Sequence, residues 1–285
     1  MLFCKIESAL RAELLFEFWC KWEERLVRKS TVLLSRLMSM FCHAPWPNGF
    51  AEGSRSYTNL PHALDRWLEV LPDFRNRIQN AHVLDFGCGE GFQMVAMAEA
   101  GAASVLGVEI EISDCQVAAE LIAASPAGDK MRIEHQVPSL YFADVITSQN
   151  SFEHFMEAAE ILKIWKQCLS PSGQVLITFA PPWYSPWGAH MAYFCRLPWV
   201  HLFFSEEVVM HVRRNYRDDG ASTYSEAQLS QMSLSRFERL VRESGFELVQ
   251  ARYDCSWRLD FLQGLPIVRE LFVNRVTAVL KHPAS

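Results

Sequence analysis

The chain has 285 residues, of which 50% are hydrophobic, and it carries a formal net charge of -6. A chain of this size can bury a substantial core, as one domain with additions or as two small domains. The acidic balance leaves no basic stripe that would neutralise phosphates, so we expect no nucleic-acid partner.

The cysteine spacing and the N-terminal residues indicate whether to expect a metal site, a secretory signal or a membrane span. The eight cysteines are scattered, without the paired spacing of a zinc site, so we expect reduced thiols and no metal. The N-terminus does not resemble a secretory signal, because charged residues such as Lys5 and Arg11 interrupt any apolar run. No run of about 18 apolar residues occurs that could cross a bilayer. The sequence therefore predicts a cytoplasmic protein and does not favour a membrane location.

Residues 1–50 form the first unit that we expect, a helical extension. Apolar side chains recur at helical spacing over residues 8–41, and the charged pair Glu17 and Lys21 lies four residues apart. The segment 43–50, HAPWPNGF, should end the helix. We expect the helix to pack on the main domain, and two further roles stay open, a lid over the active site and a homodimer contact.

Strand and helix patterns alternate after this extension. Apolar strands are predicted, in chain order, at 82–87, 104–110, 131–135, 143–149, 174–180, 246–253 and 274–281. Helices are predicted between most of them. This alternation indicates βαβ units and a mostly parallel sheet covered by helices on both faces.

The regular pattern lapses after the fifth predicted strand. Residues 181–230 form an insertion that begins PPWYSPWGAH and is rich in aromatic side chains. A long insertion between two strands is where a substrate cover would lie. A capping box from Ser235 to Glu238 should then start a helix, and Gly245 should end it.

The most specific motif is VLDFGCGEGF, at the end of the first predicted strand. Gly87, Gly89 and Gly91 let the backbone turn tightly and approach a ligand closely. Glu109 ends the second predicted strand, where a carboxylate can accept hydrogen bonds from ribose hydroxyls. Asp85 adds negative charge beside the loop, which disfavours a pyrophosphate and favours a cationic cofactor.

These residues resemble the class I S-adenosylmethionine-dependent methyltransferases. In that family an acid-x-Gly-x-Gly-x-Gly loop holds the methionine end of the cofactor, and the acid after the second strand holds its ribose. The resemblance implies a Rossmann-like sheet of seven strands in the order 3-2-1-4-5-7-6. It divides the chain into the extension, 1–50, and a methyltransferase domain, 51–285, that carries the insertion 181–230.

The resemblance also implies the residues that bind S-adenosylmethionine. They are Tyr57, Asp85, Phe86, Gly87, Gly89, Gly91, Glu109, Ile110, Gln136, Gln149 and Asn150. The chain departs from the family at Gln136, near the place where an acidic residue often binds the adenine amine. An amide oxygen can replace that acid, and an ordinary surface glutamine is an equally good interpretation.

Methyl transfer from a sulfonium needs alignment and exclusion of water, with a base only where the nucleophile carries a proton. Ligands of parallel sheets lie beyond the carboxyl ends of the strands. The catalytic candidates are therefore His154, past the fourth strand, and Tyr184 and His190, past the fifth. Each has a structural alternative, as a cofactor-pocket residue, a wall of the pocket or a buried histidine.

Three functions stay open. The first is methyl transfer to a small, partly apolar or aromatic metabolite, because the acceptor side is rich in aromatic and poor in basic residues. The second is cyclisation of S-adenosylmethionine itself to azetidine-2-carboxylate, with release of methylthioadenosine. The third is a non-catalytic cofactor-binding partner of another protein, which the intact glycine loop argues against.

Overall fold

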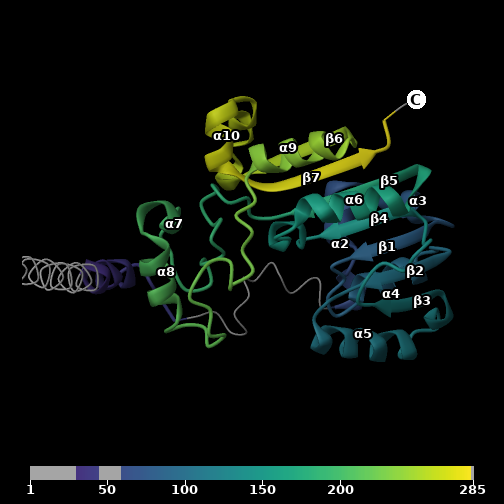
Figure 1. Cartoon of the computed structure of the whole chain (residues 1–285), viewed down its shortest axis with the longest axis horizontal. Helices are drawn as coiled ribbons and strands as arrows, with labels where there is room; N and C mark the ends of the chain where they lie inside the picture. Colours follow the sequence, from purple (N-terminus) through teal and green to yellow (C-terminus); the bar gives the residue numbers. More distant parts are fainter. Residues whose placement is uncertain (1–29, 45–58, 284–285) are drawn as a thin grey trace, which may run out of the picture.

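The computed structural model describes residues 30–44 and 59–283. Seven strands form one sheet in the order β3-β2-β1-β4-β5-β7-β6, which confirms the predicted order. The strands are β1 (His82–Phe86), β2 (Ser104–Val108), β3 (Met131–Glu134), β4 (Ala143–Gln149), β5 (Leu169–Phe179), β6 (Glu247–Cys255) and β7 (Val273–Lys281). Strands β1 to β5 are parallel to their neighbours in this group, and β7 runs antiparallel between β5 and β6 (Figure 1).

Helices cover both faces of this sheet. Those before the insertion are η3 (Leu60–His62), α2 (Asp65–Val70), α3 (Phe74–Ile78), α4 (Phe92–Glu99), α5 (Ile112–Ala124), η4 (Gly128–Lys130), η5 (Phe152–His154) and α6 (Ala158–Cys168). Those after β5 are α7 (Val200–Phe203), α8 (Glu206–Arg213), α9 (Leu234–Ser244), η6 (Ser256–Arg258), η7 (Asp260–Gly264) and α10 (Pro266–Phe272). No helix in the described part of the chain is both long enough and apolar enough to span a bilayer.

Two apolar clusters explain why both faces are covered. Neighbouring residues of β1 point to opposite faces, so Val83 packs among side chains of α2, α3 and α4, whereas Leu84 packs among those of α6 and α9. Both side chains are fully buried. The central strands therefore have two apolar faces, as strands of a parallel sheet require.

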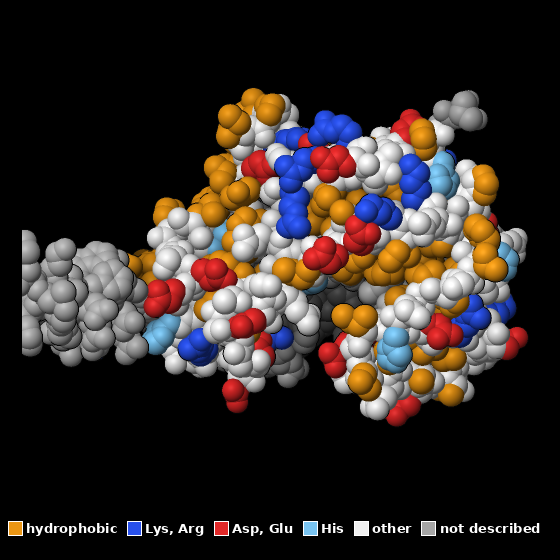
Figure 2. Space-filling view, viewed as in Figure 1, with side chains coloured by type: hydrophobic (Ala, Val, Ile, Leu, Met, Phe, Trp, Pro, Cys, Tyr) orange, Lys and Arg blue, Asp and Glu red, His pale blue; other side chains and the backbone are white. Residues whose placement is uncertain are grey.

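The segment between β5 and α9 forms a packed unit with its own apolar cluster. It contains α7 and α8, and its buried aromatic side chains are Trp183, Tyr193, Phe194, Phe204 and Tyr224. From here on, the insertion means residues 181–233, which is the predicted segment 181–230 extended to the start of α9. It lies beside the sheet domain, and Figure 2 shows the surface hollowed between the two.

The described part of the N-terminal extension is attached to the insertion. Residues 30–39 are helical, and Met38 is fully buried in the insertion's apolar cluster. Cys42 forms an antiparallel bridge with Cys195, and the His43 backbone N–H donates to the Phe194 carbonyl at 2.8 Å. The lid and homodimer roles of the extension stay predictions, because most of the extension lies outside the described residues.

The start of α9 differs from the prediction. Ser233 precedes the helix, and its hydroxyl oxygen accepts a hydrogen bond from the Arg236 backbone N–H at 3.1 Å. The predicted capping box was wrong because Ser235 and Glu238 are engaged elsewhere, with side chains of α10 and β6. Gly245 ends the helix with a left-handed φ of 72°, as predicted.

Candidate functional site

The glycine loop joins β1 to α4, and its three glycines have left-handed φ angles of 75°, 52° and 79°. A Cβ on Gly87 would lie 2.6 Å from the Ser151 hydroxyl oxygen, and one on Gly91 would lie 2.8 Å from the Ala118 Cβ. Gly89 differs, because a Cβ there would meet only an Asp114 carboxylate oxygen, at 3.9 Å. Gly89 thus leaves open space beside the loop that a ligand can occupy.

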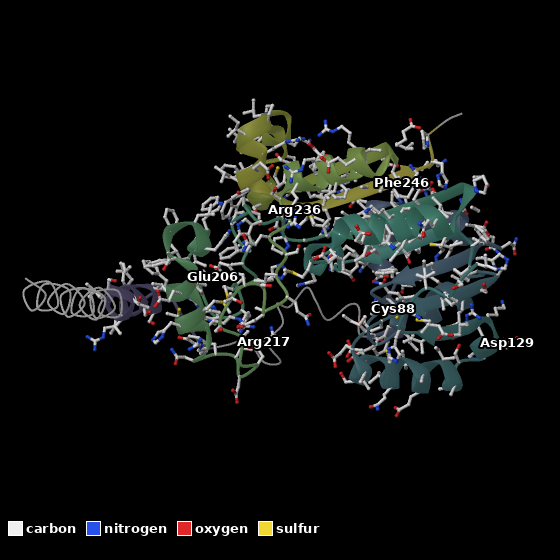
Figure 3. All side chains as sticks on the ribbon, in the orientation of Figure 1. Cys88, Asp129, Glu206, Arg217, Arg236 and Phe246 are labelled. Carbon is white, nitrogen blue, oxygen red and sulfur yellow. The ribbon has the colours of Figure 1, made fainter. Side chains whose placement is uncertain are left out.

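A cleft of about 1070 Å³ lies at the carboxyl ends of β1, β2 and β4. Seven of the predicted site residues line it: Phe86, Gly87, Glu109, Ile110, Gln136, Asn150 and His154. The connection from β3 to β4 supplies much of the remaining wall, and Gln228 of the insertion completes it. Figure 3 shows Cys88 of the glycine loop at the sheet edge that faces the insertion, where Arg217 and Glu206 are labelled.

The other predicted residues lie elsewhere. Asp85 and Gln149 are buried at the ends of β1 and β4. Tyr184 is 42% exposed on the insertion, and neither it nor His190 is among the described residues that line the cleft. Tyr57 lies outside the described residues. The roles of all these residues stay predictions.

Glu109 is held in one orientation by backbone N–H groups. Its Oε2 accepts a hydrogen bond from Gly89 at 2.9 Å, and its Oε1 accepts from Ile110 at 2.8 Å and from Glu111 at 3.0 Å. The carboxylate therefore ties the glycine loop to the turn after β2. Oε1 thus already accepts two hydrogen bonds, whereas Oε2 keeps a lone pair that can accept one more, as from a ribose hydroxyl.

Acidic groups dominate the electrostatics of the cleft. Burial raises the pKa of Asp85 to about 7, a hydrogen bond from the Thr147 hydroxyl opposes the shift, and the charge of Glu109 adds to it. Burial also raises the pKa of Asp114, with Glu109 and Glu111 contributing. Oδ2 of Asp85 is buried and has no hydrogen-bond partner among the described residues. A cationic cofactor fits this site better than a phosphate would.

The structure also brings together residues that the sequence did not connect. The rings of His154 and His190 lie 5.1 Å apart between centroids, and the His154 Nδ1 lies 2.8 Å from the Gln228 carbonyl oxygen. Burial lowers the pKa of His190 to about 3 and raises that of the neighbouring Glu153. Gln228 had no local signal, because it lies in an irregular part of the insertion.

Ser151 is a second residue that the sequence analysis missed. Its hydroxyl donates to the Gly87 carbonyl at 3.0 Å, and it lines the cleft. Its place directly after Asn150, at the end of β4, was a signal that could have identified it. The polar residues that follow β4 and line the cleft therefore include Ser151 as well as the predicted Asn150.

Comparisons with known proteins identify the family of this chain. A family model described as a methyltransferase domain matches residues 57–251. A tRNA U34 carboxymethyltransferase from Idiomarina loihiensis is 29% identical over 123 residues, which cover 39% of this chain and 36% of that protein. The match therefore spans only about a third of the length of that relative.

Solved structures show the same fold. An S-adenosylmethionine-dependent methyltransferase from Mesorhizobium loti superposes with a TM-score of 0.51 at 15% identity, covering 79% of this chain and all of that one. The [4+2]-cyclase SpnF superposes with a TM-score of 0.54 at 13% identity, covering 85% of this chain and 87% of that one. The family model, the strand order and the glycine loop agree, and the chain therefore belongs to the class I S-adenosylmethionine-dependent methyltransferases, with S-adenosylmethionine as its cofactor.

Proposed function

We propose that this protein transfers a methyl group from S-adenosylmethionine to a small, partly apolar or aromatic metabolite. The observation that carries the proposal is a shared cleft, lined both by Gly87 of the glycine loop and by Gln228 of the insertion. An acceptor held by the insertion would lie beside the cofactor, as a displacement reaction requires. The cofactor supplies a methyl group on a cationic sulfur.

The insertion has the rigidity that an acceptor site needs. The Trp183 ring packs edge-on against His201 and Tyr224, with centroids 4.7 Å and 4.9 Å away. The Trp183 backbone N–H also donates to the Met232 carbonyl at 2.8 Å, which fastens the start of the insertion to its end. A packed cover of this kind supports exclusion of water from the reacting groups.

His154 is the proposed acceptor-side residue with the most suitable geometry for a base. A carbonyl oxygen only accepts hydrogen bonds, so the contact with Gln228 places a proton on the His154 Nδ1. The Nε2 then keeps a lone pair that can accept a proton from an acceptor. Tyr184 remains a proposed contact of the acceptor, since its ring is partly exposed on the insertion.

The curated relative acts on tRNA, as its name states. For this chain we propose a small molecule instead, because the net charge of -6 is unsuited to a polyanion. Apolar cleft residues point the same way, among them Phe86, Val108, Tyr141, Phe155 and Ile161.

Product analysis tests the proposal. The protein is incubated with methyl-labelled S-adenosylmethionine alone, then with a panel of small aromatic and apolar metabolites, and then with tRNA. We expect S-adenosylhomocysteine and a labelled product only with a small acceptor. Methylthioadenosine formed from cofactor alone would favour the cyclisation instead. Label transferred only to tRNA, or cofactor binding without any product, would contradict the proposal.

A further inference from the structure

Three side chains with metal-binding atoms converge at the carboxyl end of β4. Glu153 and His154 come from η5, and His190 comes from the insertion. One ligand atom from each lies within 4.8 Å of the others. The two imidazole rings are inclined to each other by 65°, so they are not stacked.

Glu153 is a buried carboxylate that lacks a partner for one oxygen. Its side chain is 4% exposed, and one oxygen accepts a hydrogen bond from the Ala180 backbone N–H at 3.3 Å. The other oxygen, Oε2, is buried and has no hydrogen-bond partner among the described residues. Leaving such an oxygen unpaired is costly, and a bound cation would satisfy it.

His154 is oriented as metal-binding histidines are. Its Nδ1–H donates to the Gln228 carbonyl, which leaves the Nε2 lone pair free for a cation. Ser230 strengthens this arrangement, because its backbone N–H and its hydroxyl both donate to the Glu153 carbonyl, at 3.2 Å and 2.7 Å. The end of the insertion thus holds both η5 residues in place.

His190 lies at the end of a tightly turned segment. Its φ of 57° is left-handed, a conformation that non-glycine residues seldom adopt and that often occurs at functional sites. Its backbone N–H donates to the Trp187 carbonyl at 2.8 Å. Upstream, a Cβ on Gly188 would lie 1.8 Å from the Trp183 carbonyl oxygen, so only glycine fits this path.

We propose that Glu153, His154 and His190 bind a divalent transition-metal ion. One carboxylate with two imidazoles is a donor set of zinc and iron(II) sites, and three protein ligands leave coordination positions open. Metal–ligand bonds of about 2.0–2.2 Å place ligand atoms roughly 3–3.5 Å apart, so ligand atoms that now lie up to 4.8 Å apart need to approach each other by at most about 1.3–1.8 Å. The two nitrogen donors favour Zn²⁺ or Co²⁺ over Mg²⁺ and Ca²⁺.

An ion on these residues would lie at the wall of the cofactor cleft, because His154 also lines that cleft. A bound ion can take an oxygen of a ligand at an open position and lower the pKa of a hydroxyl group, whose proton passes to water. With an ion bound, the His154 Nε2 is a metal ligand and is no longer available as a base, so the ion replaces that role in activating the acceptor. This role would select acceptors with a hydroxyl or carboxylate group, and it rests on the proposed function. The metal site itself does not rest on the proposed function.

Direct metal binding tests the site. The full chain is treated with a chelator, exchanged into buffer and titrated with Co²⁺ by visible absorption, and with Zn²⁺ and Mg²⁺ by calorimetry. We expect one Co²⁺ per chain, tighter than Mg²⁺. Glu153→Gln and His190→Asn should each weaken Co²⁺ binding by at least about 100-fold, because each removes a ligand. Asparagine is chosen at position 190 because it tolerates a left-handed φ.

The matched control is His211→Asn, on the exposed part of α8, which should bind Co²⁺ as the wild type does. Binding of S-adenosylhomocysteine shows that each variant is folded. The proposal is overturned if the wild type binds no stoichiometric Co²⁺ or Zn²⁺, or if both ligand variants bind Co²⁺ unchanged. Stoichiometric Co²⁺ binding without any methylated product would support the site and contradict the proposed function.

Discussion

We expect the ionisation of the buried Asp85 carboxyl group to be coupled to cofactor binding. Its pKa of about 7 arises mainly from burial, so this side chain changes charge near neutrality. A cationic ligand binds the ionised carboxylate more tightly than the neutral acid. We expect the affinity for S-adenosylmethionine to rise up to roughly tenfold per pH unit below the pKa, between about pH 6 and about pH 7, and then to level off. Calorimetric titrations across this range should show a flat profile for Asp85→Asn, and an equal slope in both proteins would contradict this account.

The same residue lowers the stability of the ligand-free protein as pH rises. Its folded pKa lies above its unfolded value, so the folded state binds more protons between about pH 4 and about pH 7. The contribution of the neutral acid to stability is complete below this window and is lost as pH rises through it. Urea unfolding at about pH 4 and at about pH 7 should show that the free energy of unfolding falls less between these pH values in Asp85→Asn than in the wild type.

Gly89 and Gly220 provide a matched pair for testing the glycine loop. Both have left-handed φ angles, of 52° and 74°, and at neither would a Cβ meet an atom closer than 3.9 Å. Substitution by alanine should therefore cost each about 1–2 kcal/mol of stability, through backbone strain alone. Only Gly89→Ala should also weaken cofactor binding, by at least about tenfold, because its Cβ enters the space beside the loop. Calorimetry on both variants checks this, and equal losses of affinity would show that the open space is not used.

At the scale of elements, the helix 30–39 supports the insertion through Met38. Met38 is fully buried in the insertion's apolar cluster, whereas Met40, two residues later, is 78% exposed. Met38→Ala should cost about 2–4 kcal/mol and increase proteolytic cleavage within the insertion. Met40→Ala should change stability by less than about 0.5 kcal/mol. Thermal unfolding and limited proteolysis compare the two, and similar results for both variants would contradict this role.

At the scale of the whole molecule, the cleft joins the sheet domain to the insertion. A ligand that touches both Gly87 and Gln228 should stabilise both parts. At a concentration of about 100 times its Kd, S-adenosylhomocysteine should add roughly 2.7 kcal/mol to the free energy of unfolding and slow proteolysis between residues 181 and 233. At the same concentration of S-adenosylhomocysteine, the free energy of unfolding of the Asp85→Asn variant should increase by less than that of the wild type. Stabilisation of the protein without protection of the insertion would argue against a shared cleft.

The positions of the strands and the glycine loop followed from the sequence because their signals are local, whereas the order of the strands followed from the family resemblance. Apolar runs of a buried strand, and glycines at a strand-to-helix turn, are visible within about ten residues. The predicted ends of strands differ from the observed ends where tertiary contacts extend an element. Strand β5 begins at Leu169 rather than at residue 174, because its ladder with β4 continues past a register shift.

The fold family, the cofactor and the sheet edge of the expected cofactor site can all be predicted from the residues of the chain. The contact of His154 with His190, the place of Gln228 in the cleft wall and the unpaired oxygen of the buried Glu153 are seen only in the folded protein. Residues 181–233 have little periodic structure, so their path is set by long-range packing and by single hydrogen bonds. A motif with a fixed local geometry can be recognised in a sequence, whereas a site assembled from distant segments exists only in the folded chain.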